Sequence, residues 1–346
     1  MFKKISPIKC SITQNSSLIA AIELLNKQEH GFAFLVVVDE KSRLLGTLTD
    51  GDIRRSLLKG KKIEGPVKDF MFWNPVHTRY DASVDNIERL FSLITAPNPF
   101  LPLVDDDQKV IEILIKTNKS AKNVNALIMA GGFGKRLGKK TKDTPKPLIT
   151  VRNKPLLEHV ILNIKESGVE QIFISVHYLA EQIYEFVEKN GYSDFVTLLH
   201  EEKPMGTAGS LSLLPESQSS NFLVTNCDII TGLNYESFID FHMIQNSDAT
   251  IAVAEHRFQV PFGVIQHNKD GEFSGIKEKP VITNYVAAGL YCFSSKFIKK
   301  TNRKSYLDMP DLLSIGKSFN FKMSLFPIHE DWTDVGRPDD LEKANN

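Results

Sequence analysis

Short apolar stretches alternate with amphipathic ones along the last two thirds of the chain. The apolar stretches are rich in Val, Ile and Phe, as is typical of buried strands, and the segments between them repeat apolar residues at helical spacing. This alternation predicts an α/β domain with a mostly parallel sheet and crossover helices. The expected strands are 125–130, 171–176, 195–199, 221–226, 249–255, 263–267, 273–278 and 286–293, and the expected helices are 155–167, 179–189, 207–213, 235–245 and 338–345.

The first third of the chain contains a weak internal duplication. One copy starts near Ile12 and the second near Val67, and each has an amphipathic segment followed by apolar strands. The strands FLVVVD and LPLVDD end alike in acidic residues. The order expected for each copy is strand, helix, strand, strand, helix. A short polar linker, 118–124, joins this pair (1–120) to the α/β domain (124–346).

The segment 127–148, LIMAGGFGKRLGKKTKDTPKPL, leads from a strand into a loop rich in glycine and basic residues. Glycine lets the backbone approach a phosphate closely, and successive N–H groups can form an anion-binding nest. A Walker loop is excluded, because Met129 and Arg136 stand where it needs Gly and Ser or Thr. The dinucleotide fingerprint is also excluded, since Gly138 comes one residue late. The candidate phosphate-binding residues are Gly131, Gly132, Gly134, Lys135, Arg136 and Lys146.

A carboxylate follows the apolar strand that ends at Asn226. Asp228 is thereby placed at the carboxyl edge of a parallel sheet, where ligands of such folds bind. A carboxylate oxygen is a ligand that suits Mg²⁺, which takes one or two protein oxygens together with phosphates. Asp228 is therefore a candidate metal ligand.

The loop resembles the signature of the sugar-1-phosphate nucleotidyltransferases, G-G-x-G-x-R-L followed by P-K-P. The strand ending in Asp228, the E-K-P element at 278–280, the strand NYVAAGLY and the W-x-D-x-G element at 332–336 resemble the same family in the same order. The resemblance implies a Rossmann-like domain in which a sugar phosphate attacks the α-phosphorus of a nucleoside triphosphate and releases pyrophosphate. It also implies catalysis by Arg136 and Lys146, nucleotide binding by the glycine loop with Lys135, Mg²⁺ binding by Asp228 and Asp334, and sugar-phosphate binding by Glu278, Lys279 and Gly289.

A second loop, EEKPMGTAG, resembles the base-reading loop of the guanylyltransferases in this family. Its candidate nucleotide-binding residues are Glu201, Gly206 and Thr207. Guanine presents two neighbouring N–H donors that one carboxylate can accept together, and a wrong base would leave that buried charge unpaired. The sequence therefore favours GTP. Thymidylyl or uridylyl transfer by the same family remains open, as does a non-catalytic regulator that senses nucleotides.

The duplicated first third resembles a tandem pair of CBS domains, modules that bind adenine nucleotides or serve as dimerisation scaffolds. The first copy carries GTLTDGD, in which the resemblance assigns nucleotide contacts to Thr49 and Asp52. The second copy has Glu112 in the equivalent stretch but no Thr-x-x-Asp. We expect at most one well-formed adenine nucleotide site per chain and a homo-oligomer formed through these domains. The order of CBS pair and transferase resembles the glucosamine-1-phosphate guanylyltransferases of bacterial legionaminic acid pathways, which implies a role in nonulosonate or surface glycan synthesis.

The overall charge argues against nucleic acid and membrane partners. The chain of 346 residues has 42 basic and 42 acidic side chains and contains no long apolar run. Its basic start is not followed by the apolar run of a signal peptide. Cys10, Cys227 and Cys292 form no metal-binding or CxxC spacing, so we expect buried reduced thiols in a cytoplasmic protein.

Overall fold

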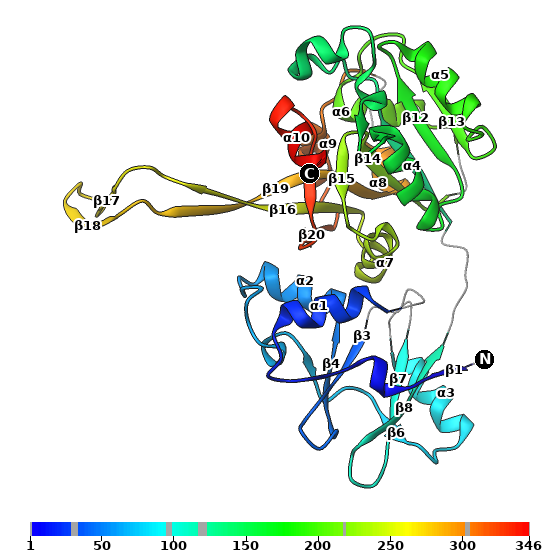
Figure 1. The fold of residues 1–346 in the computed structure, drawn as a ribbon, viewed down its shortest axis with the longest axis vertical. Helices are drawn as coiled ribbons and strands as arrows, with labels where there is room; N and C mark the ends of the chain where they lie inside the picture. The colour runs from blue at the N-terminus through cyan, green and yellow to red at the C-terminus, as the bar shows by residue number, and fades with distance from the viewer. Residues whose placement is uncertain are drawn as a thin grey trace. The chain divides into compact units, whose positions relative to one another are not determined.

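The computed structural model of the protein describes residues 2–28, 34–94, 99–116, 123–216, 219–301 and 305–345 (Figure 1). The chain divides into two compact units, Met1–Ala121 and Lys122–Asn346. Most of the linker expected at 118–124 lies outside the described residues.

The larger unit is built on a seven-stranded sheet in the order β13-β12-β9-β14-β19-β16-β20. Its first four strands are parallel to one another and β16 is parallel to β20, whereas β19 runs antiparallel to both of its neighbours. The prediction of a mixed, mostly parallel sheet is therefore confirmed. The strands are β9 (Val124–Met129), β12 (Ile172–Val176), β13 (Val196–His200), β14 (Asn221–Asn226), β16 (Ala249–Gln259), β19 (Val281–Ser294) and β20 (Met323–Ile328).

Helices cover both faces of this sheet, because alternate residues of a strand point to opposite faces. On β9, Val124, Ala126 and Ile128 pack into an apolar cluster with α4, α5 and α7. Leu127 packs into a second cluster with α6, α8 and α9. The helices are α4 (Leu156–Glu166), α5 (Ala180–Lys189), α6 (Gly206–Gly209), α7 (Tyr235–Gln245), α8 (Ser295–Thr301), α9 (Met309–Ser318) and α10 (Pro338–Asn345).

Some elements differ from those expected. The helix expected at 207–213 is the short α6 followed by a 3-10 turn, η5 (Ser210–Leu213), and it stops there because Pro215 favours an extended Leu214, whose φ is −60° and ψ 132°. The strands expected at 249–255 and 286–293 are longer than predicted. Their extensions pair with each other beyond the sheet, where no residue is buried, so burial imposes no apolar pattern that would mark them. Helices α8 and α9 and strand β20 were not among the expected elements.

The extended parts of β16 and β19 form a two-stranded ribbon that leaves the body of the larger unit (Figure 1). The ribbon carries β17 (Val264–His267) and β18 (Phe273–Lys277) at its outer end. We call residues 255–287 the arm. No residue of the arm is buried.

The smaller unit contains two four-stranded sheets of the same design. One has the order β2-β3-β4-β5 and the other β6-β7-β8-β1, so the first strand of the chain completes the second sheet. In each sheet the first pair is parallel and the other two pairs are antiparallel. The elements are β1 (Phe2–Ile5), β2 (Ser11–Thr13), α1 (Leu18–Asn26), β3 (Phe34–Val38), β4 (Leu44–Thr49), α2 (Asp50–Leu58), β5 (Phe72–Trp73), β6 (Thr78–Arg79), α3 (Val84–Leu93), β7 (Phe100–Val104) and β8 (Val110–Lys116).

Local details of the two copies also match. The carboxylate of Asp39 accepts two backbone N–H groups of the turn after β3, and the carboxylate of Asp105 does the same after β7. Both hairpins have a register shift just before that turn. The internal duplication is therefore real. The copies differ after the second strand of the hairpin: α2 follows β4, but the described residues show no equivalent helix after β8, contrary to the expected order.

Candidate active site

The structure requires glycine at some positions of the loop after β9 and not at others. A Cβ on Gly131 would lie 2.7 Å from Oε1 of Glu201, and Gly134 has φ +63° with Thr141 Cγ2 at 2.9 Å from its Cβ position. A Cβ on Gly132 would meet no atom within 4 Å. The fold itself therefore demands glycine at 131 and 134, while Gly132 leaves open space on the pocket side.

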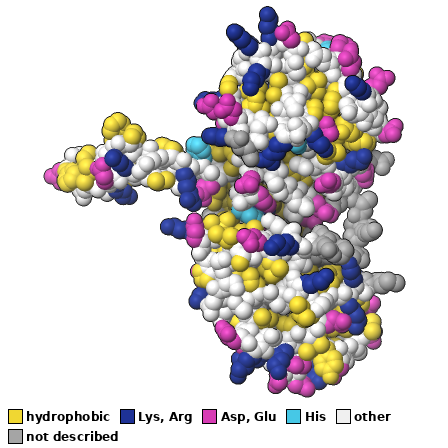
Figure 2. Space-filling view, viewed as in Figure 1, with side chains coloured by type: hydrophobic (Ala, Val, Ile, Leu, Met, Phe, Trp, Pro, Cys, Tyr) yellow, Lys and Arg dark blue, Asp and Glu magenta, His cyan; other side chains and the backbone are white. Residues whose placement is uncertain are grey.

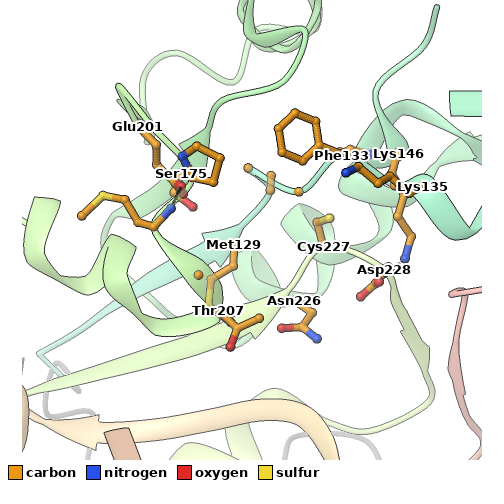
Figure 3. A pocket seen from close by; sticks show the side chains of 18 of the residues that line it. Met129, Phe133, Lys135, Lys146, Ser175, Glu201, Thr207, Asn226, Cys227 and Asp228 are labelled. Atoms are coloured by element: carbon orange, nitrogen blue, oxygen red, sulfur yellow. Dashed lines mark hydrogen bonds and ion pairs between the residues drawn. The ribbon is translucent and has the colours of Figure 1, made fainter. Parts of the chain in front are cut away.

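This loop forms one wall of a pocket of about 530 Å³ (Figure 3). The pocket lies at the carboxyl ends of β9 and β14, which are neighbouring parallel strands whose last paired residues are Met129 and Asn226. Glu201 stands on one side of it, and Lys135, Lys146 and Asp228 stand on the other (Figure 3). Of the predicted site residues it brings together Gly131, Gly132, Gly134, Lys135, Arg136, Lys146, Glu201, Gly206, Thr207 and Asp228.

Two acidic residues far apart in sequence meet beside this pocket. Strand β15 (Ile229–Thr231) pairs with β21 (Trp332–Asp334), and the register sets Asp334 opposite Ile229, next to Asp228. The N–H of Val335 donates to the carbonyl of Asp228 at 2.9 Å. Asp334 is therefore held at the pocket by backbone pairing, although it does not line the pocket wall itself.

Basic side chains surround these carboxylates. Lys146 and Asp228 form a buried ion pair through Nζ and Oδ2. Arg136 lies close to Asp334, because a Cβ on Gly336 would be 3.3 Å from both Arg136 and Asp334. Sequence alone showed no basic partner for either acid, since Lys146 is far from both along the chain.

One oxygen of each acid has no partner among the described residues. Oδ1 of Asp228 and Oδ1 of Asp334 are both buried without a hydrogen bond. Burial raises the pKa of Asp334, the negative charge of Asp228 raises it further, and Lys146 and Arg136 oppose the rise. Two buried acceptors that repel each other form a place where a cation would be stabilised.

The loop that carries Glu201 is held in place by its own hydrogen bonds. Glu201 is only 4% exposed, and its Oε2 accepts the backbone N–H of Met205 at 3.1 Å. Gly206 has φ +81°, and a Cβ there would lie 2.6 Å from the carbonyl oxygen of Leu307. The side chain of Thr207 accepts the N–H of Met309, and its backbone N–H donates to Asp308. Thr207 thus fixes the loop to the start of α9.

The residues predicted to bind the sugar phosphate do not all lie together. Gly289 is near the pocket, because its Cβ position is 2.8 Å from Nδ2 of Asn226, which lines the pocket. Its φ of +73° requires glycine. Glu278 and Lys279 are exposed and lie on the arm, and neither lines the pocket. Within a single chain the described pocket therefore lacks these two side chains.

Two family models match the chain. Residues 125–346 match the nucleotidyl transferase model, and residues 6–59 match the CBS domain model. The chain belongs to the nucleotidyl transferase family. The resemblance seen in the sequence, a CBS domain followed by a sugar-1-phosphate nucleotidyltransferase, is thereby confirmed.

Relatives of this nucleotidyl transferase include two curated enzymes. It is 30% identical over 223 residues to the mannose-1-phosphate guanylyltransferase catalytic subunit beta of Drosophila pseudoobscura pseudoobscura, covering 62% of this chain and 60% of that protein. It is 30% identical over 230 residues to a mannose-1-phosphate guanyltransferase of Yarrowia lipolytica, covering 63% and 62%. The transferase thus spans only about 60% of the length of such relatives.

Solved structures show the same fold. HddC from Yersinia pseudotuberculosis complexed with GMP-PN is 27% identical with a TM-score of 0.51, covering 64% of this chain and 97% of that one. A putative glucose-1-phosphate thymidylyltransferase from Bacillus anthracis, at 21% identity and a TM-score of 0.50, shares the fold alone.

The sequence missed several pocket residues of the transferase. Tyr306 and Asp308 line the pocket, and the Tyr306 hydroxyl donates to Asp308 at 2.9 Å. The N–H of Thr207 is the main cause that lowers the pKa of Asp308. Phe133 is 40% exposed and lies edge-on to His177. Nζ of Lys135 lies over the Phe133 ring, 5.2 Å from its centre. No motif marked Tyr306 or Asp308, because they reach the pocket only through the packing of α9 on α6.

The residues predicted to bind a nucleotide in the smaller unit form a helix cap. Thr49 and Asp52 make a capping box at the start of α2, with a 2.6 Å bond between their side chains. Asp52 also pairs with Arg55 at 2.6 Å. A basic pocket of about 540 Å³ in this unit, lined by Lys3, Lys4, Lys9 and Lys27 among others, includes neither Thr49 nor Asp52.

The three cysteines are free and buried, as expected. Burial raises the pKa of Cys227, and Asp228 raises it further, so this pocket residue is a protonated neighbour of the acids rather than a nucleophile. In the part of the chain that the structure describes, no helix has the length and apolar character needed to cross a membrane.

Proposed function

We propose that this nucleotidyl transferase is a guanylyltransferase that uses GTP, a sugar 1-phosphate and Mg²⁺ to make a GDP-sugar and pyrophosphate. The observation that carries the proposal is the meeting of Asp228 and Asp334, each with an unpartnered buried oxygen, beside Lys146 and Arg136 at the glycine loop. Transfer of a nucleotidyl group needs this kind of site, since positioning and charge stabilisation supply most of the rate.

Different residues of the chain bind the triphosphate and stabilise the charge on the phosphates. Backbone N–H groups at Gly131 and Gly132 bind the triphosphate, and the space beside Gly132 admits it. An oxygen of the sugar phosphate forms a bond to the α-phosphorus while the bond to the β-phosphate oxygen breaks. Arg136 and Lys146 stabilise the charge on the phosphates as pyrophosphate leaves. No general base is needed, because a sugar phosphate is already anionic at neutral pH.

The donor set beside the pocket fits Mg²⁺. Carboxylate oxygens are the ligands that Mg²⁺ prefers, and it takes one or two of them with phosphate and water oxygens. Asp228 and Asp334 would hold the ion through the oxygens that lack partners. A bound Mg²⁺ would neutralise phosphate charge in the transition state.

Guanine is favoured at the other side of the pocket. The buried carboxylate of Glu201 lies opposite the basic residues, so a bound nucleotide would have its base at Glu201 and its phosphates at Lys135 and Lys146 (Figure 3). The bond from Met205 holds this carboxylate ready. Two relatives are guanylyltransferases by name and HddC was solved with a guanine nucleotide analogue, which supports GTP. Glucosamine 1-phosphate, for a nonulosonate or surface glycan pathway, is the sugar phosphate we propose to test first.

The decisive experiment is a matrix of GTP, dTTP, UTP and CTP against several sugar 1-phosphates, followed by pyrophosphate release. GTP should be preferred, and Glu201→Gln should cost GTP about 1–3 kcal/mol of transition-state stabilisation. Preference of the wild type for dTTP or UTP would refute the guanine assignment. Absence of turnover in every combination would favour a nucleotide-sensing regulator instead.

The metal assignment has a test that needs no turnover. Mn²⁺ bound to the wild type should enhance water proton relaxation, and Asp228→Asn and Asp334→Asn should each weaken that binding. Asp308→Asn, at the opposite wall of the pocket, is the matched control and should bind Mn²⁺ as the wild type does. Unchanged binding in both carboxamide variants would refute the metal site.

For the smaller unit we propose one adenine nucleotide site and a role in homo-oligomer formation. Calorimetric titration of the full chain with AMP, ADP and ATP tests the first part. Any bound nucleotide should shift turnover only if it binds two conformations with different affinities. Absence of heat and of stabilisation with all three nucleotides would leave the unit as a scaffold.

A further inference from the structure

The arm cannot be stable as an isolated element. A two-stranded ribbon is at best marginally stable in water, and no residue from Glu255 to Ala287 is buried. Among the described residues no third strand pairs with its stem, the paired residues Glu255–Gln259 and Val281–Tyr285, because the pairing of β16 with β20 ends at Ala254. The arm therefore has both backbone edges free and needs a surface to pack against.

The arm also exposes many large apolar side chains, which in Figure 2 gather toward its outer end. Exposed apolar patches of this kind mark surfaces that bind other proteins. The arm has four acidic and four basic residues, so it has no net charge to attract nucleic acid or an acidic membrane. Its exposed large apolar residues are Phe258, Phe262, Val264, Ile265, Phe273, Ile276, Val281, Ile282 and Tyr285.

The stem keeps the arm away from its own pocket. Its pairing is regular from Glu255 opposite Tyr285 to Gln259 opposite Val281, and the only register shift between β16 and β19 lies earlier, at Ile251 and Val253. The stem contains no Gly, Pro or bulge, the features that let a ribbon bend sharply. At about 3.3 Å per residue the stem displaces Glu278 and Lys279 outward by roughly 17 Å from the sheet.

We propose that the arm of one chain packs on a second copy of this chain and completes that copy's active site with Glu278 and Lys279. The inference rests on the proposed transferase function and on the sugar-phosphate binding that the family resemblance implies for these two residues. The described pocket contains neither of them, although it contains the predicted phosphate-loop and base-loop residues. An arm with open edges, apolar side chains and a regularly paired stem supplies the missing side chains to a neighbour.

The contact itself can be tested without activity. All three native cysteines are buried, so Phe273→Cys introduces an accessible thiol near the end of the arm. The full-length variant is labelled with a maleimide that carries a photoreactive benzophenone and is irradiated at micromolar concentration. A product of twice the chain mass is expected. Products of single-chain mass alone would overturn the proposal. Ser212→Cys on the body of the unit, labelled in the same way, is the control for random collision.

Completion of the site is tested by mixing two defective chains. In the first, residues 257–283 are replaced by Asn-Gly, a two-residue turn that rejoins β16 and β19 without removing any buried residue. The second is Asp228→Asn, which keeps its arm. Each alone should be nearly inactive. Pairs isolated through two different affinity tags should have one working site, about half of the wild-type activity per pair.

Each result has a distinct meaning. Full activity of the armless chain, or mixed pairs no more active than their components, would overturn completion of the site by a second copy. Lys279→Ala provides a second partner for the same mixing experiment if the armless chain fails to fold. A wild type that transfers no nucleotide would refute the proposed function, while the crosslink would still decide whether arms contact a second copy.

Discussion

Adjacent glycines of the phosphate loop should respond to alanine in opposite ways. Gly131→Ala places a Cβ 2.7 Å from Oε1 of Glu201, so this carboxylate must move and its bond to Met205 is lost. A hydrogen bond to a charged group contributes about 1.5–3 kcal/mol, and in a unit of this size each kcal/mol shifts the melting temperature by roughly 2–4 °C. We expect Gly131→Ala to lower the melting temperature of the larger unit by about 3–12 °C without any substrate.

Gly132→Ala should leave the free protein intact. Its Cβ meets no atom within 4 Å and its φ is not positive, so the loss of backbone freedom in the unfolded chain makes the change neutral or slightly stabilising. The same Cβ would occupy space that the triphosphate needs. GTP binding should therefore weaken by about 10-fold or more in Gly132→Ala, although the free protein is not destabilised.

The two units can be observed separately. The chain has two tryptophans, Trp73 in the smaller unit and Trp332 in the larger one, so a Trp73→Phe background leaves Trp332 to report unfolding of the larger unit. Melting curves give the stability and titration with GTP gives the affinity. An unchanged melting temperature for Gly131→Ala, or a marked loss for Gly132→Ala, would refute the reasoning from close approach.

Three further outcomes follow from the described contacts. Burial lowers the pKa of His242 to about 4, so below the ordinary pKa of 6.5 the unfolded chain gains a proton that the folded chain does not. The free energy of unfolding of the larger unit should therefore fall by about 3 kcal/mol between pH 7 and pH 4. His242→Gln should remove most of that loss in denaturant titrations. Thr49→Ala should destabilise the smaller unit by about 1 kcal/mol through loss of the helix cap, whereas Thr49→Ser should not, with Trp73 fluorescence as the measurement. Arg136→Ala should lower the rate constant of turnover roughly 10²–10³-fold, and an effect confined to KM would contradict its role in stabilising charge.

Local sequence signals predicted most strands and helices of the larger unit and many of the residues that line its pocket. The order of strands and helices around the glycine loop was readable because each buried strand is a short apolar run bounded by turns, as at β9 and β14. The motif residues of the loop and the strand-end acid also converge as expected. Where strands pair outside the core, as in the arm, burial imposes no regular apolar pattern, and the full length of β16 and β19 was not predicted.

Other features depend on contacts between distant segments and could not be read from spacing. The pairing of Lys146 with Asp228 joins residues 82 positions apart, and Asp308 reaches the pocket by way of Thr207, 101 positions away. Thr49 and Asp52 differ from these residues, because the sequence motif assigned them to a nucleotide while the structure uses them to cap a helix. Their side chains satisfy each other and the first turn of α2.

The position of β19 in the sheet gives the arm a mechanical character. The strand lies between β14 and β16 and is hydrogen-bonded to both, so the arm is rooted in the middle of the sheet rather than at its edge. A force applied at the outer end of the arm is therefore transmitted to two ladders of hydrogen bonds in the sheet. Gly289 lies at the base of the arm, and its Cβ position is 2.8 Å from Nδ2 of Asn226 at the end of β14. A displacement of the arm would therefore act first on β14, the strand that leads into Asp228.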